Sequence, residues 1–325
     1  MSESFAHAFK WAKRQTDSGA LPTAVLGIAT ASGIQAIEAF GASGSRRARV
    51  EDHYRLFSVT KPLVGLVAAR MIERGLATPE TPLQADMPAF GAARSDVVRL
   101  SHLASHTSGI AEPAMDSSAG LEAGLLGEQD FAAGTVSRYS TIAFAGIARM
   151  IEARLSTTWD AAVAELLDPI GATGITLDEA SDPHEIADAA DAGVDIQRFA
   201  ALRHPGAGLI GRAEDLLAIG AALLRDSGEI VQPTTLTMMR RPLTGDIPRL
   251  EPYVASRGQD WGFTWNLRTR APGLIDRDVY GHAGWSGGQF WVHPTAGVAY
   301  VLLTNRALTP GVDADELDNA VVSRT

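Results

Sequence analysis

The chain has 325 residues, of which 46% are hydrophobic and 20% charged, and its formal net charge is −10. A chain of this length exceeds the size at which a single hydrophobic core keeps growing, so we expect two lobes. The acidic balance argues against nucleic acids and anionic membranes as partners. The absence of cysteine excludes thiol catalysis, disulfides and thiolate metal sites.

No run of 18 apolar residues occurs in the sequence, so it predicts no membrane-spanning helix. Residues 1–20 contain Lys10, Lys13 and Arg14 among aromatic side chains, and they include neither an apolar core nor a cleavage site. This is not the pattern of a signal peptide. We therefore expect the protein to lie in the cytoplasm.

The first 40 residues predict a helix and a hairpin. Residues 3–17 have the amphipathic spacing of a helix that ends near Gly19. Two apolar runs follow at 25–30 and 34–40, and the short segment Ala31-Ser32-Gly33 separates them. That arrangement is typical of a β-hairpin.

The middle of the chain is predicted to be helical. A helix opens at Ser58 and stops at Gly75, and Pro62 is tolerated because it lies near the first turn. From about residue 78 to 200 the sequence is rich in alanine and reads as helical, with interruptions at prolines and Gly/Ser/Asp turns. Another amphipathic helix is expected at 213–224.

The C-terminal part of the chain has strand-like runs at 261–267, 289–293 and 298–304. Pro294-Thr295-Ala296-Gly297 joins the last two runs as a hairpin turn, and a final helix is expected near 313–322. Strands therefore belong to both ends of the chain and helices to its middle.

This order predicts an α+β protein with a mostly antiparallel sheet, flanked by N- and C-terminal helices, and an inserted all-helical lobe. We expect residues 1–75 and 205–325 to form a discontinuous mixed α/β lobe and residues 76–204 to form the helical lobe. The cleft between the two lobes is where we expect the active site.

Lysine is rare in this chain, since Lys10, Lys13 and Lys61 are the only lysines among 28 basic residues. Lys61 follows Ser58 by three positions, at the start of a predicted helix. That spacing places the two side chains on one helix face. A desolvated lysine can give up its proton, whereas an arginine cannot. Lys61 is therefore a candidate base beside Ser58 as nucleophile, although a surface lysine that merely follows a serine would show the same pattern.

Two further motifs follow in order, Arg138-Tyr139-Ser140-Thr141 and the segment 280–288 with the sequence Tyr-Gly-His-Ala-Gly-Trp-Ser-Gly-Gly. Together with Ser58-Val59-Thr60-Lys61, they resemble the serine β-lactamase and penicillin-binding-protein superfamily. The similarity is greatest to the branch that holds class C β-lactamases and family VIII carboxylesterases. Accessory matches lie at 103–110, 167–172, 208–216 and 301–306.

The resemblance implies a β-lactamase/transpeptidase-like fold and an acyl-enzyme mechanism that uses no cofactor and no metal. Ser58 would be the acylated nucleophile. Lys61 and Tyr139 would share the work of the base, and Tyr139 would also relay a proton to the leaving group. A packed helix-face tyrosine is the structural alternative for Tyr139.

The third motif of the family is Lys-Thr-Gly or a variant, and here it is His282-Ala283-Gly284. The resemblance implies catalytic work for His282, and a turn histidine is the alternative. The backbone N–H groups of Ser58 and Trp285 would form the oxyanion hole. Thr141, Gly284 and Trp285 would contact the substrate.

Thr141 departs from the class C pattern, which has asparagine at this position. A carboxamide both donates and accepts hydrogen bonds to an amide substrate, and one hydroxyl cannot replace that pair. The sequence therefore predicts a serine carboxylesterase that acts on a small-molecule ester. A D-amino-acid amidase, peptidase or β-lactamase on the same residues is the main alternative. A binding protein that is acylated without turnover is a third.

Other patterns carry less weight. The segment 284–288 matches G-x-S-x-G, but the acid and histidine that this motif needs do not follow it in order. The segment 206–211 matches G-x-G-x-x-G without the preceding strand that a dinucleotide site requires. His102 and His106 have helical spacing but lack a third ligand for a metal. Four tryptophans could equally wall an acyl pocket or pack in the core: Trp261, Trp265, Trp285 and Trp291.

Overall fold

The computed structural model describes residues 5–92, 94–253, 258–270 and 275–324. Its main sheet has eight strands in the order β3-β2-β1-β10-β9-β8-β7-β6, and β4 pairs with β5 separately. All the pairings between these strands are antiparallel. The strands are β1 (Thr23–Thr30), β2 (Gly33–Ser43), β3 (Arg46–Arg47), β4 (Tyr54–Arg55), β5 (Ile210–Gly211), β6 (Asp260–Trp261), β7 (Asn266–Leu267), β8 (Tyr280–Ala283), β9 (Gln289–His293) and β10 (Val298–Leu303).

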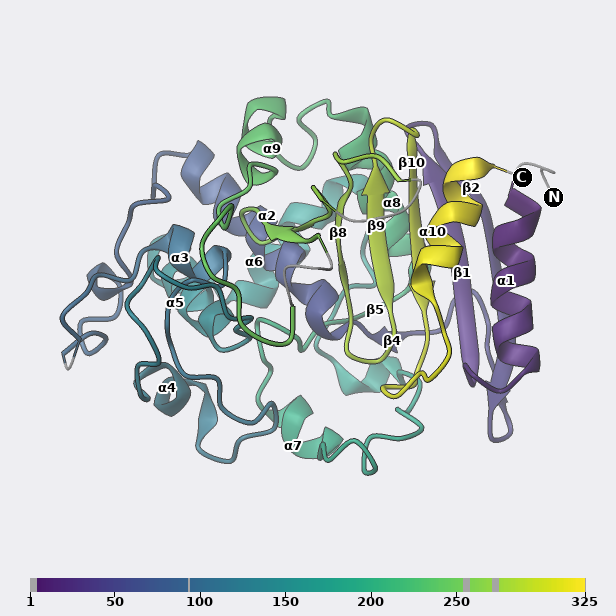
Figure 1. Ribbon diagram of the computed structural model, residues 1–325, viewed down its shortest axis with the longest axis horizontal. Helices are drawn as coiled ribbons and strands as arrows, with labels where there is room; N and C mark the ends of the chain where they lie inside the picture. Colours follow the sequence, from purple (N-terminus) through teal and green to yellow (C-terminus); the bar gives the residue numbers. More distant parts are fainter. Residues whose placement is uncertain (1–4, 93, 254–257, 271–274, 325) are drawn as a thin grey trace.

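Helices cover both faces of the sheet, and a second group of helices joined by irregular segments lies beside it (Figure 1). Within the described residues, none of them is long and apolar enough to cross a membrane. The α-helices are α1 (Ala6–Asp17), α2 (Thr60–Glu73), α3 (Leu100–Ala104), α4 (Gly120–Leu125), α5 (Ala143–Leu155), α6 (Trp159–Leu167), α7 (Ile196–Ala201), α8 (Ala213–Arg225), α9 (Pro233–Met239) and α10 (Ala314–Ser323). Short 3₁₀ turns are η2 (Phe57–Val59), η3 (Leu83–Ala85), η4 (Asp168–Ile170) and η5 (Glu179–Ser181).

The central strand β10 is buried on both faces. Successive side chains of a strand point to opposite faces. Val301 and Leu303 accordingly lie in the cluster that includes α8, whereas Tyr300 and Leu302 lie in the cluster that includes α1 and α10. Figure 1 shows α10 in front of the strands and α8 behind them, with both chain ends at the same edge.

A close approach of helix and sheet occurs at the middle of β1. Gly27 pairs with Val301 of β10 and with Ile37 of β2. A Cβ atom at position 27 would collide with the side chain of Leu217 on α8. Glycine at this position therefore lets α8 lie directly against the strand.

The helical part lies beside the sheet (Figure 1), where α2 packs against α5 and α6, and α5 also packs against α3 and α4. Over 78–200, where the sequence predicts helices interrupted at prolines and turns, the structure has α3 to α7 joined by long irregular segments. Gly127 lies just beyond the end of α4, and Pro169 lies just beyond the end of α6. One buried apolar cluster runs from α8 through α2 to α5, and the lobe boundaries at residues 75/76 and 204/205 stay a prediction.

The elements at the two chain ends follow the sequence pattern closely. The expected hairpin at 25–40 is β1 and β2, the expected hairpin at 289–304 is β9 and β10, and α10 occupies 314–323. The expected helix at 3–17 is observed as α1 over Ala6–Asp17, and residues 3 and 4 of the predicted range lie outside the described part.

The prediction of a single strand at 261–267 was wrong. This segment folds back on itself as β6 and β7, which pair with each other. Gly262 N–H donates to the Trp265 carbonyl at 2.9 Å, and Thr264 takes a φ of 66° in the turn. The Thr264 N–H donates to the carbonyl oxygen of Ala104 at the end of α3 and not to a neighbouring strand. Local alternation of side chains could not show that turn, because its hydrogen-bond partners are remote in sequence.

Candidate active site

Ser58 lies in the 3₁₀ turn η2, immediately before α2. The turn closes through Val59 N–H, which donates to the Leu56 carbonyl at 3.1 Å. Phe57 has a φ of 43°, in the left-handed region that bulky residues rarely adopt. Lys61 is on the first turn of α2, and its Nζ lies 3.0 Å from Ser58 Oγ. The helical spacing therefore brings the two side chains together as the sequence predicted.

Lys61 is completely buried, with 0% of its surface exposed. Its Nζ also lies 3.3 Å from Thr141 Oγ1 and 2.9 Å from the carbonyl oxygen of Gly206. Desolvation lowers the pKa of Lys61 to about 7, against the opposing charge of Glu112. Burial disfavours the ammonium form, so the neutral amine is populated near neutral pH.

Tyr139 lies just before α5 and reaches the same point. Its hydroxyl hydrogen-bonds the Ser58 side chain, and Lys61 Nζ lies 4.6 Å from the centre of its ring. The imidazole of His106 packs on the tyrosine ring at 4.5 Å and accepts the N–H of Ser140 at 3.0 Å. Desolvation raises the pKa of Tyr139 well above its usual value. The phenol therefore keeps its proton and is suited to relay one.

His282 is buried in β8. Its Nδ1 lies 2.7 Å from the carbonyl oxygen of Ala283, which can only accept, so Nδ1 carries the hydrogen. The unprotonated Nε2 then faces the hydroxyl of Tyr139 at 3.5 Å. Desolvation, helped by the charge of Lys61, lowers the pKa of His282 to about 3. The imidazole of His282 is thus neutral, and its Nε2 can accept a hydrogen bond from the Tyr139 hydroxyl.

The end of β8 lies directly against the turn that carries Ser58. A Cβ atom on Gly284 would meet the carbonyl oxygen of Leu56, so glycine permits this approach. A tight turn follows, in which Gly284 N–H donates to Gly288 at 2.7 Å. The ring of Trp285 lies 5.1 Å from that of Phe57. The chain segment that bears the Trp285 N–H is therefore beside Ser58.

Two of the four tryptophans lie near the Ser58 site and two are core residues. Trp285 borders the apolar cluster of Phe57 and Phe199 next to Ser58. Trp261 lies against Tyr139 at 5.4 Å, behind the site. Trp265 and Trp291 are buried parts of the two main cores.

Several groups around Lys61 were not identified from the sequence. Glu112 accepts the N–H groups of Thr141 at 2.8 Å and Ile142 at 3.2 Å. His204 accepts the Gly206 N–H at 2.9 Å and so shapes the loop whose carbonyl faces Lys61. These residues lie in irregular segments with no periodic signal. Only the accessory match at 103–110, which ends two residues before Glu112, pointed to this region.

The patterns set aside in the sequence have other roles. Ser286 is 1% exposed and donates to the Arg55 carbonyl at 3.5 Å, in a turn between two strands. His102 accepts the Arg99 N–H at the start of α3, whereas His106 serves Ser140. Among the described residues, no group of three or more His, Asp or Glu side chains is arranged to hold a metal ion.

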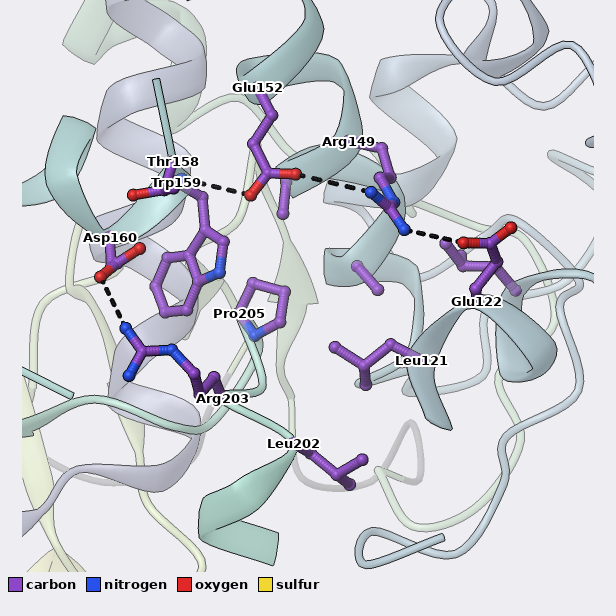
Figure 2. A pocket seen from close by; sticks show the side chains of 13 residues that line it. Leu121, Glu122, Arg149, Glu152, Thr158, Trp159, Asp160, Leu202, Arg203 and Pro205 are labelled. Carbon is purple, nitrogen blue, oxygen red and sulfur yellow. Dashed lines mark hydrogen bonds and ion pairs between the residues drawn. The ribbon is translucent and has the colours of Figure 1, made fainter. Parts of the chain in front are cut away.

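A separate cavity of about 310 Å³ lies beside α5 (Figure 2). Arg149 bridges Glu122 and Glu152 on one side of it, and Arg203 pairs with Asp160 at 3.0 Å on the other. Its apolar lining is Leu121, Leu125, Ala145, Ala148, Trp159, Leu202 and Pro205. The nucleophile and its partners are not part of this lining, so the cavity is distinct from the Ser58 site.

Known proteins share both the sequence pattern and the fold. The family model described as Beta-lactamase matches residues 9–323. Penicillin-binding protein 4 of Amycolatopsis lactamdurans is 27% identical over 278 residues, which cover 76% of this chain and 71% of that protein.

Two similar solved structures are hydrolases by their descriptions. EstCE1, a hydrolase with promiscuous acyltransferase activity, has a TM-score of 0.80 and 21% identity, with 99% of each chain covered. A family VIII carboxylesterase has a TM-score of 0.79 and 20% identity, with 99% of this chain and 98% of the other covered. The fold is therefore that of the serine β-lactamase and penicillin-binding-protein superfamily, and the chain belongs to the Beta-lactamase family.

Proposed function

We propose that this protein is a serine hydrolase that cleaves small carboxylic esters through an acyl-enzyme on Ser58. The observation that carries the proposal is the contact of Lys61 with Ser58. A fully buried amine with a pKa near 7 lies 3.0 Å from a serine hydroxyl. A serine needs an adjacent base to become a nucleophile, and this amine is suited to be that base at neutral pH.

Acylation follows from this geometry. Neutral Lys61 takes the proton of Ser58 as Oγ forms a bond to the ester carbonyl carbon. The developing negative charge on the carbonyl oxygen is stabilised by the backbone N–H groups of Ser58 and Trp285. As the carbon–oxygen bond to the alcohol breaks, Tyr139 gives its proton to the leaving oxygen. The ammonium of Lys61 then returns a proton to Tyr139, so the charges balance.

Deacylation uses the same groups in reverse order. A water molecule attacks the acyl carbonyl, loses its proton to the Tyr139–Lys61 pair, and Ser58 Oγ recovers a proton as it leaves. Neutral His282 accepts a hydrogen bond from the Tyr139 hydroxyl at 3.5 Å and holds it near the leaving group. In this proposal His282 is a positioning residue, since its pKa of about 3 gives it no proton to supply.

The preference for esters rests on Thr141. Its hydroxyl oxygen faces Lys61 at 3.3 Å, and this single oxygen lacks the separate donor and acceptor atoms with which a carboxamide pairs to the amide group of a peptide or β-lactam. The similar fold of a family VIII carboxylesterase supports the same substrate class. The sequence relative named as a penicillin-binding protein keeps amide or β-lactam hydrolysis as the alternative. An acylated protein that does not turn over is the remaining alternative.

The first experiment is hydrolysis of p-nitrophenyl butyrate by the wild type, Ser58→Ala and Lys61→Arg. We expect turnover by the wild type, none by Ser58→Ala, and a loss of roughly 10²–10⁴-fold in Lys61→Arg, because arginine keeps the charge but cannot be a base. Lys13→Arg, at an exposed lysine, is the matched control. If the wild type does not cleave p-nitrophenyl butyrate but hydrolyses a cephalosporin or a D-amino-acid amide, the amide or β-lactam alternative replaces the ester proposal. A stable adduct without turnover would support the binding protein.

A further inference from the structure

The first turn of the helix that follows Tyr139 is capped by a carboxylate from another segment. The side chain of Ser140 accepts the Ala143 N–H at 3.2 Å. The two N–H groups before it, on Thr141 and Ile142, both donate to Glu112 at 2.8 and 3.2 Å. Helix N-termini leave such N–H groups without partners inside the helix, and a carboxylate there is also favoured by the helix dipole.

This cap holds two parts of the site at once. Thr141, whose N–H it binds, presents its hydroxyl to Lys61 at 3.3 Å. Tyr139 lies two residues earlier on the same short segment. A loss of the cap would therefore loosen the contact of Thr141 with Lys61 and the placement of the Tyr139 hydroxyl beside Ser58.

Glu112 and the buried amine of Lys61 share Thr141 as a partner, since Glu112 binds its N–H at 2.8 Å and Lys61 Nζ lies 3.3 Å from its hydroxyl. The other titratable groups that surround Lys61 come from four separate segments, and they are His106, Tyr139, His204 and His282. Desolvation lowers the pKa of each of the three histidines, and it raises the pKa of Tyr139. All four are neutral near pH 7. Within the described residues, Glu112 is the one carboxylate whose charge acts on the pKa of Lys61.

We propose that Glu112 is a positioning residue of the Ser58 site, whose carboxylate anchors the Tyr139–Thr141 segment and places an anion on Thr141, the residue whose hydroxyl contacts Lys61. Glu112 is an exposed residue, and its carboxylate turns inward to the helix start. Desolvation raises its pKa, and the Ile142 N–H and the charge of Lys61 oppose that rise. The carboxylate in turn stabilises the ammonium form of Lys61. This inference rests on the proposed serine mechanism but not on the choice of ester as substrate.

The test compares wild type, Glu112→Gln, Glu112→Ala and Glu122→Gln. Glu122 on α4 is the matched control, because it is an exposed carboxylate paired with Arg149 at 2.9 Å and it caps no helix (Figure 2). Each variant is treated with a fluorophosphonate probe that labels activated serines, and the labelling rate is measured from pH 5 to 9. The same proteins are assayed with p-nitrophenyl butyrate, and their folding is checked by circular dichroism.

In Glu112→Gln the amide oxygen can still accept an N–H while the charge is gone. We expect the acid limb of its labelling profile to move to lower pH, because Lys61 loses its proton more readily without a neighbouring anion. Glu112→Ala loses the cap as well, so its maximal rate should fall by about fivefold or more. Glu122→Gln should match the wild type in both respects.

An acid limb that stays in place in Glu112→Gln, or one that moves equally in Glu122→Gln, would overturn the proposal. The rate of labelling by the fluorophosphonate probe does not depend on which substrate the enzyme cleaves, so it separates this outcome from failure of the esterase proposal. A shifted labelling profile in a protein that does not cleave the butyrate ester would retain the role of Glu112 and remove the ester as substrate. If Glu112→Ala does not fold, the isosteric Gln variant still decides the question.

Discussion

The Nζ atom of Lys61 lies 2.9 Å from the carbonyl oxygen of Gly206, a residue 145 positions away in the chain. A carbonyl can only accept a hydrogen bond. A neutral amine has two hydrogens and one lone pair, and Lys61 has three close partners. With hydrogens directed to Gly206 and Thr141, the lone pair is left for the hydroxyl of Ser58. The contact with Gly206 thus helps to leave the lone pair of the amine directed at Ser58.

The activity of the wild type should depend on pH through Lys61. Its pKa of about 7 lies below that of an ordinary lysine because of desolvation, and the base must be neutral. We expect kcat/KM for p-nitrophenyl butyrate to fall about tenfold for each pH unit below the pKa of Lys61 and to level off above that pKa. A rate that is flat from pH 5 to 9 would exclude Lys61 as the base.

Replacement of Lys61 by methionine should abolish activity and stabilise the fold. The folded protein binds the Lys61 proton more weakly than the unfolded chain does, so burial of this group costs stability below its unfolded pKa. That cost is complete below about pH 7, where the folded lysine is protonated, and it disappears as the pH rises toward 10.5, the model-peptide range. We expect Lys61→Met to raise Tm by about 2 °C or more at pH 6. The gain over wild type should shrink at pH 9, as thermal melts at both pH values can show.

Tyr139→Phe should remove the proton relay while leaving the packing of the ring intact. The phenyl ring can still lie against His106, whose ring is 4.5 Å away. We expect kcat for the butyrate ester to drop by roughly 10²-fold or more, with Tm within a few degrees of wild type. The deficit should be smaller for the p-nitrophenyl ester than for an ethyl ester, because p-nitrophenolate needs less help from an acid. Equal losses with both esters would contradict the relay.

Thr141→Asn tests what limits the substrate class. A carboxamide at this position has an N–H₂ donor and a separate oxygen acceptor for an amide substrate, whereas threonine has one hydroxyl for both contacts. We expect the ratio of kcat/KM for a cephalosporin to that for p-nitrophenyl butyrate to rise by about tenfold. Thr141→Val, which removes only the hydroxyl, is the control and should not raise this ratio. An unchanged ratio in the Asn variant would show that specificity is set elsewhere.

Ser286→Ala should retain most of the activity. This serine fits G-x-S-x-G in sequence, yet its hydroxyl is buried and donates to the Arg55 carbonyl at 3.5 Å. The variant should keep its kcat/KM for the butyrate ester within about threefold of wild type and still be labelled at Ser58. Near-total loss of labelling would move the nucleophile to Ser286 and refute the assignment.

Much of the fold was predictable because its signals are local. The alternation of strand side chains indicated the hairpins at both chain ends, and the apolar periodicity indicated α1, α8 and α10. The short pairing of β8 was missed, since Tyr280–Ala283 forms a strand only between β7 and β9. The run at 261–267 was misread for the same reason, because its turn depends on contacts with remote segments.

The same division holds in the site. The spacing of Ser58 and Lys61 is a property of one helical turn, so the sequence by itself determined that they meet. Only the tertiary structure decided that Lys61 is fully buried, that Gly206 and Thr141 are its hydrogen-bond partners, and that Glu112 binds the N–H of Thr141. Desolvation and Coulomb interactions depend on which groups surround an atom in space. The sequence indicated the candidate groups, and the packing of distant segments creates the environment that shifts their pKa values.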